Sequence, residues 1–204
     1  MNRLLVLFLC FAAMLLVACG GTRLNVDPTW TEKPKSLTVL ITEPYVANTD
    51  DLEDDLPEYT TKFGEWMASQ LQMELRLRTG LNAEMRIEKD ENFAFAQLPI
   101  GKNMVDFQLP NPEKIKGLHG MVLTVHPIQF WRDMAPCVGQ GGCFNNKFLM
   151  AKGTYVFTDV DSHRIMGHGV FGVSSSFSFA MTKGNWEDVV KSMAKEIIED
   201  TPLE

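Results

Sequence analysis

Met121-Val122-Leu123-Thr124-Val125 carries little polar character on either side of an extended chain. A strand with this pattern is buried on both faces, because other elements cover both sides of its sheet. We therefore expect a central strand here. We also expect Pro127 to limit its hydrogen-bond ladder further along the chain, because proline has no backbone N–H to donate.

Upstream of this run, the sequence predicts a strand followed by a long helix. Leu37-Thr38-Val39-Leu40-Ile41 is β-branched and mostly apolar, as strands are. The helix is expected from Pro57 to Thr79, with proline in its first turn and Gly80 just past its end. Its apolar stripe is wide enough to pack on a sheet and comprises Phe63, Trp66, Met67, Leu71, Met73, Leu75 and Leu77.

Between that helix and the central strand, the patterns are shorter. Ala83–Lys89 alternates and predicts a second strand, residues 90–109 give no clear pattern, and Asn111-Pro112-Glu113 predicts a short helix that ends at Gly117.

After the central strand we expect a hairpin and a last helix. Phe148–Thr158 and Ile165–Ser178 are β-rich and flank an Asp-rich turn. The helix is expected from Asn185, as its cap, to Asp200. Its apolar face consists of Trp186, Val189, Val190, Met193, Ile197 and Ile198. The order of elements predicts one α/β sandwich over residues 37–204, with a mixed β-sheet on which the long helix and the C-terminal helix pack.

The first residues resemble an export signal. Arg3 is followed by the unbroken apolar run Leu4–Ala18, which is too short for a transmembrane helix but typical of a signal peptide. The run ends Leu16-Val17-Ala18-Cys19, which resembles the lipobox of bacterial lipoproteins. That resemblance implies cleavage of residues 1–18 and acylation of Cys19, whose lipid anchors the protein in a membrane. Because Gly20 follows the cysteine, rather than the aspartate of an inner-membrane signal, we expect the outer membrane. Residues 19–36 are polar and are expected to form a tether.

Two cysteines of the exported domain, Cys137 and Cys143, remain free to pair. An oxidising compartment makes a disulfide between them the expected state. A zinc site would need two further ligands, for which His119 and His126 are the nearby candidates, but the spacing of zinc motifs is missing.

The same segment, residues 130–146, is rich in large apolar side chains among glycines. Phe130, Trp131, Met134 and Phe144 are unusual in a connection. If these side chains are exposed on a bridged loop, they form a preorganised patch for binding a protein partner. The alternative is that the rings cover the hydrophobic core.

Composition and charge exclude one class of partner. The chain has 204 residues, of which 45% are hydrophobic and 22% charged, as in ordinary globular proteins. Once Arg3 leaves with the signal peptide, the acidic residues exceed the basic ones by eight. Such a surface repels phosphates, so we expect no nucleic-acid partner.

The acidic run 50–58 contains six carboxylates. A calcium loop is one interpretation, although the glycine and spacing of an EF-hand are absent. The alternative is a solvated loop whose last acids favour the positive end of the next helix.

The sequence lacks the motifs of known catalytic sites, including nucleophile elbows, zinc-protease helices and phosphate loops. His163 and His168 have no assignable carboxylate partner, and Ser174-Ser175-Ser176 has no base at a usable spacing. We therefore expect no enzyme, no cofactor and no metal. A metal-dependent hydrolase that uses the acidic run or the histidines is the rival hypothesis.

Several of these features together resemble a domain of periplasmic lipoproteins. They are the lipobox, the strand Leu37–Ile41 before a long helix, the run Gly120–Val125, and Tyr155–Asp159 followed by Arg164-Ile165-Met166-Gly167. Similar domains occur in penicillin-binding-protein activators, curli-type secretion pores and the amino-terminal part of the Tol translocation protein.

The resemblance spans about residues 37–199. It implies a non-catalytic module, anchored in the outer membrane and facing the periplasm, that binds an envelope protein or assembles with copies of itself. A subunit of an oligomeric export complex is the alternative.

Overall fold

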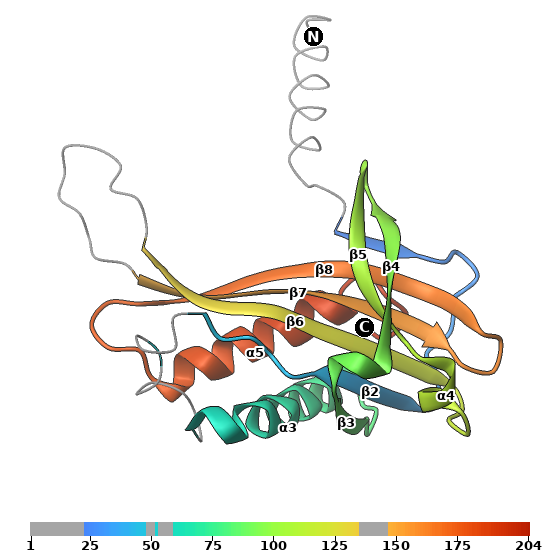
Figure 1. Ribbon diagram of the computed structural model, residues 1–204, viewed down its shortest axis with the longest axis horizontal. Helices are drawn as coiled ribbons and strands as arrows, with labels where there is room; N and C mark the ends of the chain where they lie inside the picture. Colours follow the sequence, from blue (N-terminus) through green and yellow to red (C-terminus); the bar gives the residue numbers. More distant parts are fainter. Residues whose placement is uncertain (1–22, 48–51, 53–58, 135–146) are drawn as a thin grey trace, which may run out of the picture.

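The computed structural model describes residues 23–47, 52, 59–134 and 147–204. Its strands are β1 (Leu24–Val26), β2 (Leu37–Thr42), β3 (Glu84–Glu88), β4 (Phe93–Ile100), β5 (Asn103–Pro110), β6 (Met121–Met134), β7 (Lys147–Asp159) and β8 (Arg164–Phe177). Its helices are α3 (Tyr59–Thr79), α4 (Pro112–Ile115), α5 (Lys183–Ile198) and a short 3-10 turn, η2 (Asp90–Asn92). Figure 1 shows a long twisted sheet with α3 and α5 packed beneath it.

The main sheet has the strand order β1-β8-β7-β6-β2-β3 and is mixed, as predicted. β6 pairs in parallel with β2 and antiparallel with β7, and the remaining neighbours are β7 with β8, β8 with β1, and β2 with β3. The predicted central strand therefore lies at the junction between the parallel and antiparallel halves of the sheet.

Pro127 does not end this strand. The register of β6 against β7 shifts between Pro127 and Gln129, and pairing then continues to Met134. The bulge places the missing N–H of proline where the ladder is already interrupted, so the strand extends seven residues past it.

One face of the sheet is covered by α3 and α5. Their buried side chains form the main hydrophobic core with β2, β6, β7 and β8, and the entire predicted face of α5 is buried. The predicted stripe of α3 is too wide, because Met73 and Leu77 are exposed while Leu71 and Leu75 are fully buried. On a helix, positions two apart lie on different sides, so Leu77 cannot share the buried face with Leu75.

The start of α5 differs from the prediction by three residues. Thr182 is the N-cap, and the amide oxygen of Asn185 accepts hydrogen bonds from the backbone N–H and the hydroxyl of Thr182 (2.9 and 3.0 Å). Asn185 thus stabilises the helix start from its first turn rather than from the cap position.

The opposite face is covered in part by the β4–β5 hairpin, within the segment that gave no clear sequence pattern. The hairpin crosses the sheet: Phe93 at its base packs with Leu40 and Val122, and its middle and far end pack on Val156 and Val170. It therefore runs from β2 and β6 over β7 to β8, and its tip projects past the edge formed by β1 (Figure 1).

The segment expected to be a tether contributes to the domain. Leu24–Val26 pairs antiparallel with Gly167–Gly169 of β8, and the ring of Trp30 packs against Phe157 at 5.0 Å between centroids. Short strands without apolar alternation give little sequence signal, because their stability comes from the neighbouring strand.

A glycine of β7 permits close packing at the bulge. A Cβ atom at Gly153 would overlap the carbonyl oxygen of His126 and the ring of Phe171, whereas Gly172, in the neighbouring strand β8, has open space around it. We predict that Gly153→Ala lowers the free energy of unfolding by about 1–3 kcal/mol, because backbone and ring must both shift.

Gly172→Ala is the matched control, and we expect it to change stability by less than about 0.5 kcal/mol. Urea unfolding followed by circular dichroism measures both variants. Equal stability of the two variants would show that the packing at Gly153 is not tight.

Candidate functional site

On the face of the sheet opposite α3 and α5, the hairpin covers one end and leaves the other end open. The open part consists of the C-terminal part of β6 and the N-terminal part of β7. Since Val156 packs under the hairpin, alternation places Lys152, Met150 and Phe148 on that same face. Trp131 lies directly opposite Met150 in the adjacent strand. We call these four residues, Trp131, Phe148, Met150 and Lys152, the distal face.

Three residues of the distal face, Trp131, Phe148 and Met150, are apolar and half-buried, whereas Lys152 is exposed. The Lys152 ammonium lies 5.4 Å from the centroid of the Trp131 ring, a cation–π contact that restricts both side chains. Trp131, Phe148 and Met150 are each partly exposed, and no described helix or strand packs over them. A tryptophan held this way presents a rigid apolar surface at low entropic cost.

The predicted binding patch is divided by the sheet. Phe130 points to the other face, is fully buried, and packs against Phe63 (5.5 Å between centroids) and Trp186 (5.9 Å). Its assignment as a partner-binding residue is therefore wrong. The segment predicted as a loop is still strand at this point, and in a strand consecutive side chains point to opposite faces. Phe130 thus contributes to the core while Trp131 contributes to the distal face.

Met134, the last residue of β6, is 69% exposed and remains a candidate contact, but alternation places it on the side of Phe130 and not on that of Trp131. Phe144, the cysteine pair Cys137 and Cys143, the six acidic residues of the run 50–58 and Cys19 lie outside the described residues.

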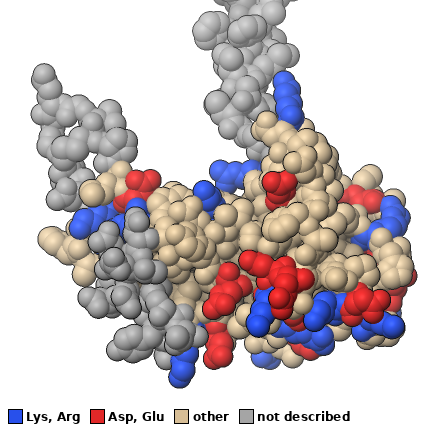
Figure 2. Space-filling view, viewed as in Figure 1, with Lys and Arg blue, Asp and Glu red and all other residues tan. Residues whose placement is uncertain are grey.

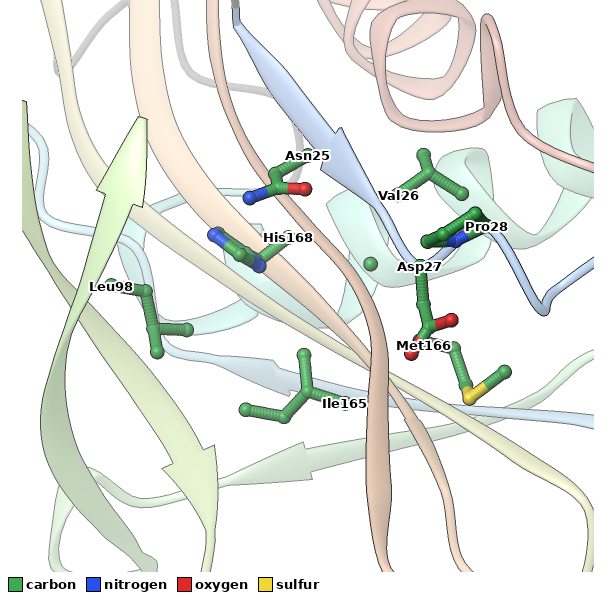
Figure 3. A pocket seen from close by; sticks show the side chains of 9 residues that line it. Asn25, Val26, Asp27, Pro28, Leu98, Ile165, Met166 and His168 are labelled. Carbon is green, nitrogen blue, oxygen red and sulfur yellow. The ribbon is translucent and has the colours of Figure 1, made fainter. Parts of the chain in front are cut away.

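A second candidate is a groove of about 330 Å³ where β1, β8 and the hairpin meet. Figure 3 shows Asn25 from β1, His168 from β8 and Leu98 from β4 arranged around it. The lining is mostly aliphatic and the groove is open to solvent, so only its polar groups could supply chemistry.

Two of those polar groups, His168 and Asp27, are engaged within the protein. His168 donates from Nε2 to the carbonyl oxygen of Pro99 (2.9 Å), and its ring packs edge-on against Phe107. Asp27 accepts from Thr29 and from Arg164 (2.7 Å), and these hydrogen bonds, foremost that of the Thr29 hydroxyl, lower the pKa of its carboxyl group. The contact between His168 and Pro99 at this groove therefore fixes the hairpin to the sheet.

His119 has a structural partner as well. His119 donates from Nδ1 to Asp161 (3.0 Å), which lowers the pKa of that carboxyl group, and Asp161 also accepts from the N–H of Gly120 (2.9 Å). His163 adopts a φ of +54° in the β7–β8 turn. Among the described residues, no three His, Cys, Asp or Glu side chains come close enough together to hold a metal ion.

His126 lies at the border between the hairpin and the distal face. Its Nδ1 atom is 2.7 Å from the hydroxyl oxygen of Thr42, and burial lowers its pKa below the ordinary value of 6.5, although the charge of Asp90 opposes this shift. The neutral form is thus favoured in the folded protein.

Acidic and basic side chains are unevenly distributed over the face of the molecule seen in Figure 2. In Figure 2 the acidic side chains gather mainly over the lower half of this view, and basic colour marks the top of the projecting hairpin. Among the helices of the described residues, none combines the length and the apolar character needed to span a bilayer.

No protein-family model matches the chain, and no curated protein matches it either. Several solved structures are similar in shape. PelC from Paraburkholderia phytofirmans, solved as a dodecamer, has a TM-score of 0.44 and 12% identity, over 89% of this chain and 98% of that one. A DUF330 protein from Xanthomonas campestris has a TM-score of 0.43 and 10% identity, over 87% and 89% of the two chains. Lipoprotein GNA1162 from Neisseria meningitidis has a TM-score of 0.38 and 8% identity, over 80% and 99%.

The lowered pKa of His126 predicts a pH dependence of stability. Well above pH 6.5 this histidine is neutral in both states, and as the pH falls towards and below that value the unfolded chain binds the proton more readily. The free energy of unfolding should therefore decrease between about pH 7.5 and about pH 5.5, and His126→Gln should reduce this decrease.

The control is His163→Asn, since asparagine tolerates the left-handed backbone of the turn. It should retain the wild-type decrease. A His126→Gln variant with the same pH profile as wild type in urea unfolding would contradict the assignment.

Proposed function

We propose that this protein is a non-catalytic, lipid-anchored module of the bacterial cell envelope that binds another protein through its distal face. The observation that carries the proposal is the row of Trp131, Met150 and Phe148, which is apolar and partly exposed, with no described element over it. Soluble proteins cover such surfaces or use them for binding.

The described chemistry favours binding over catalysis. A catalytic site needs a nucleophile or base that is free to act on a substrate. In the groove, however, His168 and Asp27 are occupied by Pro99, Thr29 and Arg164. The distal face offers one cation, Lys152, and it already lies over Trp131.

The location follows from the leader. Residues 1–18 act as a signal peptide, Cys19 is acylated, and Gly20 directs the lipoprotein to the outer membrane, with the domain in the periplasm. In this compartment Cys137 and Cys143 form a disulfide in the connection between β6 and β7. The bridge shortens the connection that leaves the sheet beside the distal face, so the surface is preorganised for its partner.

Acylation at Cys19 has a direct test in the native host. Cys19→Ser removes the thiol that carries the lipid, so the protein should leave the membrane fraction or remain as an uncleaved precursor. Detergent-phase partitioning and the apparent mass of the product measure both outcomes, with Cys10→Ser as the control that should partition as wild type does. Unchanged partitioning of Cys19→Ser would refute the anchor.

Binding through the distal face can be tested by site-specific photocrosslinking in living cells. A photoreactive residue at Asp133, which is exposed, lies opposite Phe148 and shares a face of β6 with Trp131, should give a discrete adduct. The matched control is the same residue at Leu77, which is 72% exposed on α3. Trp131→Ala should lower the yield at Asp133 several-fold, because aromatic side chains that become buried in an interface dominate its binding energy.

An adduct of twice the chain mass would identify a second copy, and another mass would identify a different envelope protein. Equal adducts at Asp133 and Leu77, or a yield that Trp131→Ala leaves unchanged, would overturn the proposal.

A further inference from the structure

The tip of the β4–β5 hairpin lies beside the point where the described chain begins. Ile100, the last residue of β4, packs in one cluster with Val170 of β8. The backbone N–H of Val170 donates to the carbonyl oxygen of Arg23 (2.9 Å). Arg23 directly precedes β1, so the hairpin turn and the start of β1 meet at the same edge of the sheet.

The length of chain before this point limits how far the domain can stand from its anchor. Cys19 precedes Arg23 by four residues, and a fully extended segment of that length spans at most about 14 Å. An acyl group on Cys19 lies in the bilayer, so the β1 edge is then held close to the membrane surface. The hairpin tip projects past that edge (Figure 1).

The side chains of the tip suit a bilayer surface. Met104 is 59% exposed, Pro99 is exposed, and Leu98 and Val105 are partly exposed. The one charged residue between positions 98 and 105 is Lys102, in the turn, although the mature chain carries an excess of acidic residues. Such a tip can place apolar atoms at the headgroup level and an ammonium group near lipid phosphates.

We propose that the tip of the β4–β5 hairpin contacts the bilayer that holds the lipid anchor, with Met104 and Pro99 in the interface and Lys102 against phosphate oxygens. This proposal rests on the acylation of Cys19 proposed above. With two points of attachment, the domain has a fixed orientation: the β1 edge faces the membrane and the β3 edge faces away. The distal face is then presented sideways, where a partner in the same membrane or in the periplasm can reach it.

The test uses the full acylated protein in vesicles of phosphatidylethanolamine with a minor fraction of phosphatidylglycerol. An environment-sensitive fluorophore is attached at Asn103→Cys, in the hairpin, or at Asn82→Cys, an exposed position before β3 at the opposite edge. Both substitutions are made with Cys137→Ser and Cys143→Ser, so that the label has one target. Quenchers on the lipid acyl chains should quench the label at position 103 several-fold more than the label at position 82.

A second variant tests the side chains themselves. Met104→Asp introduces a charge on an exposed side chain, so it should leave the fold intact and lower the quenching at position 103 several-fold. Met134→Asp is the matched control, because it makes the same change on an exposed side chain at the other end of the sheet. It should leave the quenching at position 103 unchanged.

The outcomes separate this proposal from the anchor on which it rests. Protein that does not float with the vesicles shows that the acylation has failed. Protein that floats, but whose labels at positions 103 and 82 are quenched equally, shows that the anchor holds and that the hairpin does not touch the bilayer. A tip that instead contacts a protein gives this second result and overturns the proposal.

Discussion

The burial of β6 on both faces is the constraint on which the rest of the structure depends. On one side, its core residues Leu123, Val125 and Phe130 pack under α3 and α5. On the other side, Val122 packs under α4 and the base of the β4–β5 hairpin. The helices follow the strand along its length, but the hairpin crosses it once. The sheet is therefore covered on both faces at one end and on one face at the other, and this asymmetry creates the distal face.

The same asymmetry directs binding to a face rather than to an edge. Past the end of β1, β8 forms the edge of the sheet, and side chains of α5 bind its backbone groups. The N–H of Gly172 donates to Glu196 (3.1 Å), and the carbonyl oxygen of Ser176 accepts from Asn185 (3.2 Å). Glu196 also pairs with Arg23 at 3.1 Å. Occupied edge groups are poor templates for an added strand, so the half-covered surface of Trp131 and its neighbours is the better place for a partner.

Two contacts connect the anchor end of the chain to the rest of the domain. β1 pairs with β8, and the hairpin is fixed to the same strand by His168 and Pro99. Because both attach to β8, β1 and the proposed membrane-contacting tip belong to one unit, and β1 begins five residues after the proposed lipid anchor.

The sequence by itself determined the elements whose signal is local and periodic. The central strand, the strand before α3, the β7–β8 hairpin and the buried face of α5 follow from apolar spacing, since a side chain's direction repeats every 2 residues in a strand and every 3.6 in a helix. The lipobox is likewise a property of the linear chain, and so is the lack of a catalytic motif.

Tertiary structure alone decided the features that depend on a neighbour. β1 is three residues long and exists because β8 provides its partner, and the bulge at Pro127 lets β6 continue where its sequence predicts an end. The sequence of the β4–β5 hairpin has no clear pattern because the hairpin crosses the sheet. One of its faces covers the sheet along this path, and the other meets solvent. Phe130 and Trp131 are adjacent in the sequence and equally aromatic, yet one is in the core and the other on the candidate binding surface. That difference is set by which face the helices cover, and no local pattern contains it.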